Sequence, residues 1–309
     1  MIATITLNPS IDRRYNIKDF HKNGIYRCED YSATPGGKGI NVSRVINQLD
    51  VSPICLGFVG GFSGGFIKAQ LKSLKIKTNF TEINDETRTC LGIIYEDGSQ
   101  SEILEKGPKI NKEEIKDFIK KFKLILDRTK VMTASGSIPK GVNTDIYRYL
   151  IDLANGNGTK FILDSSNLSL IEGIKAFPYL IKPNREELEA ITKIKINSDT
   201  DIIDACENLM DMGAENIAVS LGGDGMIFVG KEGRFKINIP RIKALNPVGS
   251  GDSTVAGFAV GILKNLGIQD TLKLANACGM SNAMEKETGK INIKMVNDLI
   301  EGIEVYDIS

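Results

Sequence analysis

The chain has 309 residues, 41% of them hydrophobic, which is enough to bury a large core in one large or two small domains. Its 39 Lys and Arg residues balance 39 Asp and Glu residues, so net charge gives no sign of a nucleic acid or an anionic membrane as partner. The single histidine, His21, excludes the catalytic triads and metal sites that need histidine, and its polar surroundings predict a solvated side chain in a loop.

No apolar run approaches the roughly 18 residues of a membrane span, and residues 1–7 lack the pattern of a signal peptide. We therefore expect a soluble, cytoplasmic protein. The cysteines are scattered without the C-x-x-C spacing of a metal or redox site, so we expect small core residues in a reducing compartment. They are Cys28, Cys55, Cys90, Cys206 and Cys278.

The first half of the chain mixes two kinds of element. Residues 1–7 alternate like a strand, and a helix is expected at 41–49. Residues 15–33 and 87–104 are short strand-like segments separated by polar turns, without a helix in either. They predict a small accessory sheet beside the main domain.

Past residue 110, apolar strands alternate with amphipathic helices. Strands are expected at 131–135, 160–164, 179–182 and 216–221, and helices at 144–155, 184–192, 200–212 and 255–266. This alternation predicts an α/β fold with a largely parallel sheet and helices on both faces. Ligands of such sheets bind at the carboxyl ends of the strands.

The segment 246–254, Asn-Pro-Val-Gly-Ser-Gly-Asp-Ser-Thr, places a carboxylate and two glycines where an apolar helix begins. A helix start offers unpaired N–H groups and the positive end of the helix dipole to an anion. Asp252 could simply cap this helix. Alternatively, it could act as a general base for a substrate hydroxyl, while the amides of Gly249, Ser250, Gly251 and Asp252 stabilise a transferring phosphoryl group.

A second glycine cluster, Gly36-Gly37-Lys38-Gly39-Ile40-Asn41, opens the helix expected at 41–49. It is not a Walker A loop, because Gly39 follows the lysine where Ser or Thr is required. From local sequence alone, Lys38 could be a solvated side chain in a glycine-rich turn.

The two glycine motifs resemble the two signatures of the ribokinase-like (PfkB) sugar kinases, in the same order and at about the same separation. Segments 6–12, 135–141, 182–187 and 219–225 also match, so the resemblance covers essentially the whole chain. It implies a ribokinase-like fold, a mostly parallel sheet flanked by helices, as a single kinase domain over 1–309. It also implies a β-sheet lid formed by about 13–34 and 87–105, which in many members mates with a second subunit, so a homodimer through the lid is expected. ATP and Mg²⁺ are the implied cofactors.

The resemblance also implies roles for individual residues. Asp252 would be the catalytic base, with Gly249, Ser250 and Gly251 forming the anion hole. The implied substrate-binding residues are Asp12, Gly37, Lys38, Asn41, Arg88, Ser137 and Arg27, of which Arg88 would grip the phosphate already on the sugar and Arg27 would reach it, from the partner subunit in some relatives. The implied nucleotide-binding residues are Lys182, Asn184, Glu187, Ser220, Gly222, Gly225 and Asn276.

Three of these assignments compete with local explanations. Asn184 and Glu187 have the spacing of a helix capping box, whereas the resemblance implies that Glu187 orders metal-bound water. Ser220, Gly222 and Gly225 could form a plain hairpin turn or a turn that approaches the nucleotide. Asn276 could line the adenine pocket or be an exposed helical residue.

The implied activity is ATP-dependent phosphorylation of a ketohexose phosphate. The sequence around Asp252 and the segments 86–90 and 102–108 favour D-tagatose 6-phosphate, phosphorylated to the 1,6-bisphosphate. Phosphorylation of fructose 1-phosphate is the alternative, since both branches share the Gly-Gly-Lys-Gly motif and the arginine. A sugar-phosphate sensor without catalytic activity on the same fold is a different class of protein, which retention of Asp252 argues against.

Overall fold

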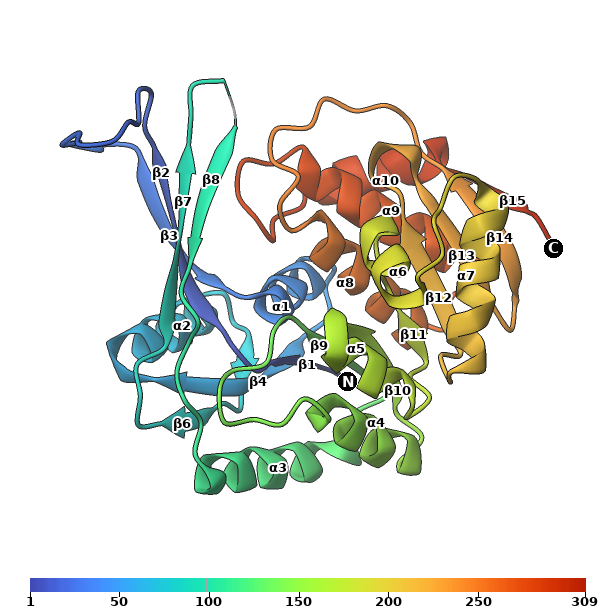
Figure 1. Ribbon diagram of the computed structural model, residues 1–309, viewed down its shortest axis with the longest axis horizontal. Helices are drawn as coiled ribbons and strands as arrows, with labels where there is room; N and C mark the ends of the chain where they lie inside the picture. Colours follow the sequence, from blue (N-terminus) through green and yellow to red (C-terminus); the bar gives the residue numbers. More distant parts are fainter. Residues whose placement is uncertain (98) are drawn as a thin grey trace.

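The structure, a computed structural model, describes residues 1–97 and 99–309. Two sheets organise it (Figure 1). The large sheet has 11 strands in the order β15-β14-β13-β12-β11-β10-β9-β1-β4-β5, with β6 also paired to β4. Its strands are β1 (Ile2–Thr6), β4 (Pro53–Gly60), β5 (Lys77–Thr78), β6 (Thr81–Ile83), β9 (Val131–Ser135), β10 (Lys160–Asp164), β11 (Leu180–Ile181), β12 (Asn216–Ser220), β13 (Met226–Gly230), β14 (Gly233–Asn238) and β15 (Glu304–Asp307).

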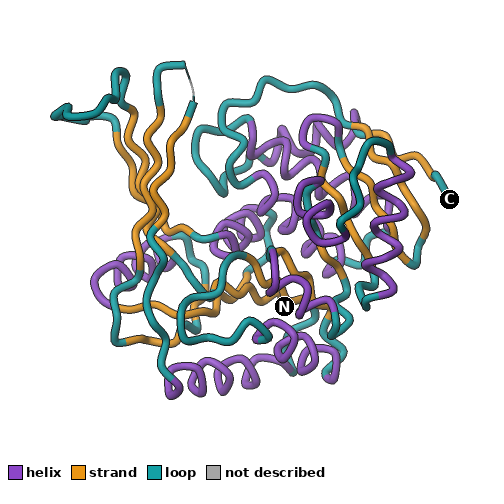
Figure 2. Tube along the Cα trace, in the orientation of Figure 1, coloured by secondary structure: helices purple, strands orange, loops and turns teal. Residues whose placement is uncertain are grey.

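Within the large sheet, neighbouring strands along the path β5-β4-β1-β9-β10-β11-β12 pair in parallel, as predicted. The remaining strands, β13, β14 and β15, pair antiparallel at the β12 edge. Helices cover both faces (Figure 2). One face carries α1 (Lys38–Gln48), α8 (Ser250–Leu263), α9 (Ile268–Ala283) and α10 (Ile293–Gly302). The other carries α3 (Lys112–Leu126), α4 (Ile146–Gly156), α5 (Asn167–Ile174), α6 (Arg185–Thr192) and α7 (Asp199–Asp211).

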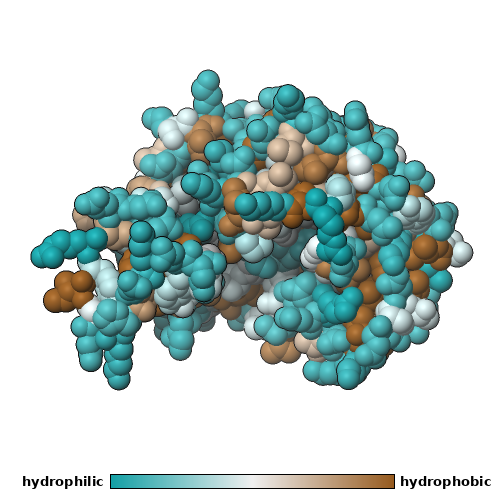
Figure 3. All heavy atoms as spheres, turned by 90° about the horizontal axis from the view of Figure 1, so that it is seen from above, coloured by the Kyte–Doolittle hydropathy of each residue, from teal (hydrophilic) through white to brown (hydrophobic). Residues whose placement is uncertain are grey.

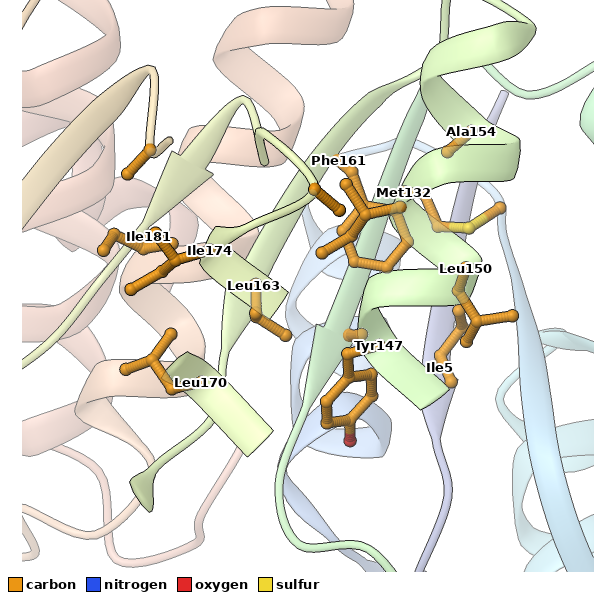
Figure 4. Packing of buried hydrophobic residues seen from close by; sticks show 14 of the residues in the cluster. Ile5, Met132, Tyr147, Leu150, Ala154, Phe161, Leu163, Leu170, Ile174 and Ile181 are labelled. Atoms are coloured by element: carbon orange, nitrogen blue, oxygen red, sulfur yellow. The ribbon is translucent and has the colours of Figure 1, made fainter. Parts of the chain in front are cut away.

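The core on the second face shows why the strands and helices form where they do. Met132, Phe161 and Leu163 project from adjacent strands against Tyr147 and Leu150 of α4 (Figure 4). All five are fully or almost fully buried. At about 25 cal/mol per Å² of apolar area removed from water, such contacts supply the main stabilisation of the sheet.

The small sheet has the order β3-β2-β7-β8 and stands away from the large sheet (Figure 1). Its strands are β2 (Ser10–Asn16), β3 (Tyr31–Gly36), β7 (Arg88–Ile94) and β8 (Gln100–Leu104), and α2 (Gly61–Ser73) packs near its base. The predicted accessory sheet is confirmed, but β2 and β3 continue to Ser10 and Gly36, beyond the predicted limits. Gly98, within the predicted segment 87–105, lies outside the described residues.

The predicted starts of two helices were too late, and one predicted strand was too long. Helix α8 begins at Ser250, five residues before the predicted start, because its first turn is glycine-rich and polar instead of apolar. Likewise α1 begins at Lys38 instead of residue 41. Strand β11 is only Leu180–Ile181, whereas β9 and β10 match the prediction. None of the helices in 1–97 and 99–309 is long and apolar enough to cross a bilayer.

His21 is exposed, as predicted, and its backbone N–H donates to Tyr26 Oη at 2.7 Å. Four of the five cysteines are buried core residues. Cys28, in the segment between β2 and β3, is the exception and is partly exposed.

Candidate active site

A cavity of about 450 Å³ lies between the small sheet and the carboxyl ends of the large sheet's parallel strands. The surface is hollowed there when the molecule is seen from above (Figure 3). Most of the predicted site residues line it: Asp12, Gly37, Lys38, Asn41, Arg88, Lys182, Asn184, Glu187, Ser220, Gly249, Gly251 and Asp252. Segments from both ends of the chain thus converge on one site.

Asp252 lies in the first turn of α8 and is 5% exposed. Its Oδ2 accepts a hydrogen bond of 2.9 Å from Asn41 Nδ2 of α1. Burial raises the pKa of Asp252 to about 7, although the positive charge of Lys38 opposes that rise. A carboxyl group that titrates near neutral pH is suited to take a proton from a hydroxyl. Its side chain does not cap the helix.

The turn before Asp252 depends on a glycine. Gly249 has φ 85°, and a Cβ there would lie 2.5 Å from Thr288 Cγ2, so a side chain fits neither the conformation nor the space. Ser250 N–H donates to Pro247 O, and Ser253 N–H donates to Gly249 O. Within the described ranges, the N–H groups of Gly251 and Asp252 have no such backbone partner, and Ser250 Oγ is buried without a hydrogen bond. These groups are donors available to an anion.

Asp164, which the sequence analysis did not single out, joins two lysines of the site. Its carboxylate oxygens lie 3.7 Å from Lys38 Nζ and 3.5 Å from Lys182 Nζ. Asp164 is 3% exposed and Lys182 is 6% exposed, and Asp164 raises the pKa of Lys38. Its position in the sequence could have marked Asp164 as a site residue. It is the last residue of a buried parallel strand, and such strand ends carry ligand-binding side chains.

The small sheet contributes Asp12 and Arg88. Arg88 Nη1 donates to Glu105 O at 2.8 Å and Nη2 donates to Asn8 O at 3.0 Å, which fixes the side chain. Its Nε is buried without a partner in the described part of the chain. Burial raises the pKa of Asp12, while a hydrogen bond of 2.6 Å from Ser10 Oγ and the charge of Arg88 oppose the rise.

Asn184 and Glu187 form the capping box of α6, the local alternative. Asn184 Oδ1 accepts from Glu187 N–H at 2.8 Å, and Glu187 Oε2 accepts from Asn184 N–H at 3.0 Å. Both residues nevertheless line the cavity. The carboxylate therefore uses one oxygen in the cap, and its other oxygen has no hydrogen-bond partner among the described residues.

The remaining predicted residues lie away from the cavity lining. Ser137 is exposed and accepts a hydrogen bond of 3.2 Å from Asn8 Nδ2. Arg27 is exposed in the segment between β2 and β3. Asn276 is buried in α9, which excludes the alternative of an exposed helical residue, and its Nδ2 donates to Leu272 O at 2.9 Å.

Gly222 and Gly225 belong to the short 3₁₀ turn that joins β12 and β13 as an antiparallel hairpin. Both have positive φ, 60° and 89°. A Cβ at Gly225 would lie 2.0 Å from Ile237 O, so this glycine serves the close packing of the hairpin on β14. Gly222 has open space around it, which leaves room for a ligand beside the backbone.

Comparisons with known proteins agree with this fold. The sequence profile described as pfkB family carbohydrate kinase matches residues 5–294. The chain is 42% identical over 311 aligned positions to the tagatose-6-phosphate kinase of Staphylococcus epidermidis, with 100% of both chains covered. The fold and the site therefore define a carbohydrate kinase, and the chain belongs to the pfkB family.

Solved structures give the same result. Phosphofructokinase-2 from Escherichia coli, in complex with substrates and products, has a TM-score of 0.90 at 27% identity, covering 97% of this chain and 98% of that one. A Thermotoga maritima protein described as a possible 1-phosphofructokinase also has a TM-score of 0.90 at 27% identity, covering 100% and 99%. The predicted ribokinase-like fold is confirmed.

Proposed function

We propose that the protein transfers the γ-phosphoryl group of ATP to a ketohexose phosphate, and that its substrate is D-tagatose 6-phosphate, which becomes D-tagatose 1,6-bisphosphate. The observation that carries the proposal is the buried Asp252, with a pKa of about 7, at a helix start whose amides face a cavity. The full-length relative at 42% identity, named tagatose-6-phosphate kinase, supports the substrate. In this proposal residues 1–309 form one kinase domain, and the small sheet is its lid.

The proposed mechanism follows from the positions of three groups. Asp252 takes the proton of the substrate's C1 hydroxyl as that hydroxyl oxygen attacks the γ-phosphorus of ATP. The bond between the γ-phosphorus and the bridging oxygen of the β-phosphate breaks, and ADP leaves. The amides of Gly251 and Asp252 bind the charge that spreads over the transferring oxygens. The resemblance implies that Lys38, with Arg88, holds the phosphate already on the sugar. Lys38 lies near both Asp164 and Asp252, so we assign its charge instead to the transferring phosphoryl group.

We assign recognition of the phosphate already on the sugar to Arg88. Its guanidinium lines the cavity and is held by the two backbone carbonyls, and its Nε is an unused donor there. A guanidinium with a fixed orientation is well suited to phosphate oxygens. Asp12 and Asn41 are placed to bind sugar hydroxyls.

ATP would bind along Lys182, Asn184 and Ser220, which continue the cavity toward the hairpin of Gly222 and Gly225. Mg²⁺ would be held mainly by the phosphates and water, with Glu187 as a carboxylate partner through water, and it would neutralise phosphate charge. The free oxygen of Glu187 fits this role. In residues 1–97 and 99–309 no three His, Cys, Asp or Glu side chains cluster closely enough to hold a metal alone.

Phosphorylation of fructose 1-phosphate at C6 is the second candidate, favoured by the similarity to the possible 1-phosphofructokinase. The two reactions are distinguished by incubating the protein with MgATP and either substrate and locating the new phosphate by ³¹P NMR. A new C1 phosphate on tagatose 6-phosphate, formed with one ADP per sugar, supports the proposal. Consumption of fructose 1-phosphate alone would support the second candidate, and binding without ADP formation would indicate a sensor.

We further propose a cytoplasmic homodimer that pairs through the small sheet. Tyr31 is 61% exposed and Ile103 is 55% exposed. The strand register places both side chains on one face of the small sheet, and Asp12 projects from the other face. Exposed apolar side chains on a sheet standing away from the main body favour association. In such a dimer, Arg27 would reach the partner's cavity.

Light scattering should give twice 33.8 kDa for the wild type, and the double variant Tyr31→Asp, Ile103→Asp should be a monomer. A monomeric wild type would reject the dimer.

A further inference from the structure

Arg14 connects the small sheet to a turn of the main body that is remote in sequence. It follows Asp12 by two residues on β2, so both side chains project from the same face, and both line the cavity. The strand register places Arg14 opposite Gly92 of β7, which is itself opposite Glu102 of β8. Arg14 thus lies in a row with a glycine and a carboxylate, and its side chain is half-buried.

The guanidinium of Arg14 reaches across the cavity mouth to the turn between α9 and α10. Nη1 donates a hydrogen bond of 2.5 Å to the carbonyl oxygen of Lys286. The same carbonyl accepts a hydrogen bond of 3.2 Å from Asn246 Nδ2. One oxygen atom therefore joins the small sheet to the segment that leads into α8.

Asn246 carries this connection to the anion-binding turn. It is 3% exposed, and its Oδ1 accepts from Val248 N–H at 3.2 Å, one residue before Gly249. Thr288, two residues after Lys286, packs against Gly249 so closely that a Cβ on the glycine would lie 2.5 Å from its methyl group. Residues 286–288 therefore pack directly against the segment that begins α8.

A second arginine holds the same turn from the main body. Arg44 of α1 donates to Thr288 O at 2.8 Å and pairs with Glu287, and it is 7% exposed. Arg44 belongs to α1, which packs on the large sheet, so its contacts do not depend on the small sheet. The contact of Arg14 does depend on the small sheet, because Arg14 lies on β2 together with Asp12, which faces the sugar site.

We infer that Arg14 is a positioning residue that couples the position of the small sheet over the sugar to the order of the anion-binding turn 246–252. The hydrogen bond from Arg14 to the Lys286 carbonyl fixes Asn246, Val248 and Gly249 in the arrangement that binds the transferring phosphoryl group, so a bound sugar phosphate that holds the small sheet in place also strengthens the order of this turn. Arg14 touches neither reacting atom. The inference rests on the proposed function for the identity of the sugar phosphate, but the contact itself is present without substrate.

Hydrogen exchange of the free protein tests the contact independently of the substrate. The variant is Arg14→Met, which retains the aliphatic stem and loses the donors. The matched control is Arg148→Met on α4, an arginine that is 50% exposed and 4.0 Å from Glu172. We expect peptides covering 246–252 to exchange about tenfold faster in Arg14→Met than in the wild type or the control, as for loss of about one charge-assisted hydrogen bond. Equal exchange in all three proteins would overturn the inference.

Steady-state kinetics with MgATP test the coupling. In Arg14→Met, kcat should fall about tenfold while the Kd of tagatose 6-phosphate changes less than about threefold, because Asp12 and Arg88 remain. Arg14→Lys should recover part of kcat, since it retains a donor. A raised Kd with normal kcat would overturn the coupling and make Arg14 a substrate ligand. If the wild type phosphorylates no ketohexose phosphate, the proposed function fails, and the exchange measurement still decides whether Arg14 orders the turn.

Discussion

Asp252 shows how the environment of one residue sets its chemistry. Asp252→Asn retains the size of the side chain and an acceptor for Asn41 Nδ2, but removes the base. We expect kcat to fall on the order of 10²-fold or more with KM values nearly unchanged. At pH 8 the variant should unfold at least about 2 °C higher than the wild type, because it no longer buries an ionised carboxylate. A folded variant with near-normal kcat would remove Asp252 from the base role.

The pKa of about 7 gives a second prediction for the same residue. The base must be ionised, so kcat/KM should fall tenfold per pH unit below about pH 7 and level off above it. The free energy of unfolding should change with pH in the opposite direction to kcat/KM. Because the folded pKa lies above the unfolded value of 3.8, the folded state binds the extra proton between these values, and stability declines as pH rises from about 4 to 7. A kcat/KM profile that stays flat down to pH 5 would contradict this assignment.

Arg88 tests the assignment of the sugar's own phosphate. Arg88→Ala should raise KM for the sugar phosphate roughly tenfold or more, the cost of about one charge-assisted contact, and leave KM for ATP nearly unchanged. The variant also frees the carbonyls of Glu105 and Asn8, so its unfolding temperature must be measured alongside. Equal increases in both KM values would show general damage to the site instead of lost phosphate recognition.

At the scale of elements, the start of α8 depends on the conformation of Gly249. Gly249→Ala places a Cβ at positive φ and 2.5 Å from Thr288 Cγ2, so the first turn must shift. If that turn binds the transferring phosphoryl group, as we propose, kcat should fall at least about 10²-fold. Gly65→Ala in α2 is the control, because apart from its chain neighbours and its own helix backbone no atom lies within 4 Å of its Cβ position, and helix propensity should then add roughly 0.5–1 kcal/mol of stability. Full activity in Gly249→Ala would mean that the turn tolerates displacement.

The elements also show where the sequence was informative. Strands β9 and β10 are short, mainly apolar segments between polar turns, so their limits could be predicted from the pattern alone. The starts of α1 and α8 could not, because their first turns consist of glycines and polar residues that form the site and carry no apolar period. Asp164 was overlooked because a lone acidic residue after a strand has no motif, and its partners Lys38 and Lys182 come together only in the fold.

At the scale of the whole molecule, the large sheet provides donors and charges at its carboxyl edge, and the small sheet places Asp12 and Arg88 opposite them. In the proposed mechanism, Arg88 of the small sheet holds the sugar's own phosphate and Asp252 of the main body acts as the base, and both residues line one cavity. A sugar phosphate can fit this arrangement with its free primary hydroxyl at Asp252, whereas an unphosphorylated pentose leaves Arg88 without its ligand. Tagatose 6-phosphate and fructose 6-phosphate are epimers, so measurable activity on both is expected.

The measurement that tests the central claim most directly is kcat/KM at saturating MgATP for tagatose 6-phosphate, fructose 6-phosphate, fructose 1-phosphate and ribose. We expect the highest value for tagatose 6-phosphate, a lower but measurable value for fructose 6-phosphate, and little activity on ribose. A clear preference for fructose 1-phosphate would assign the protein to the other phosphosugar reaction, and a preference for ribose would contradict the account.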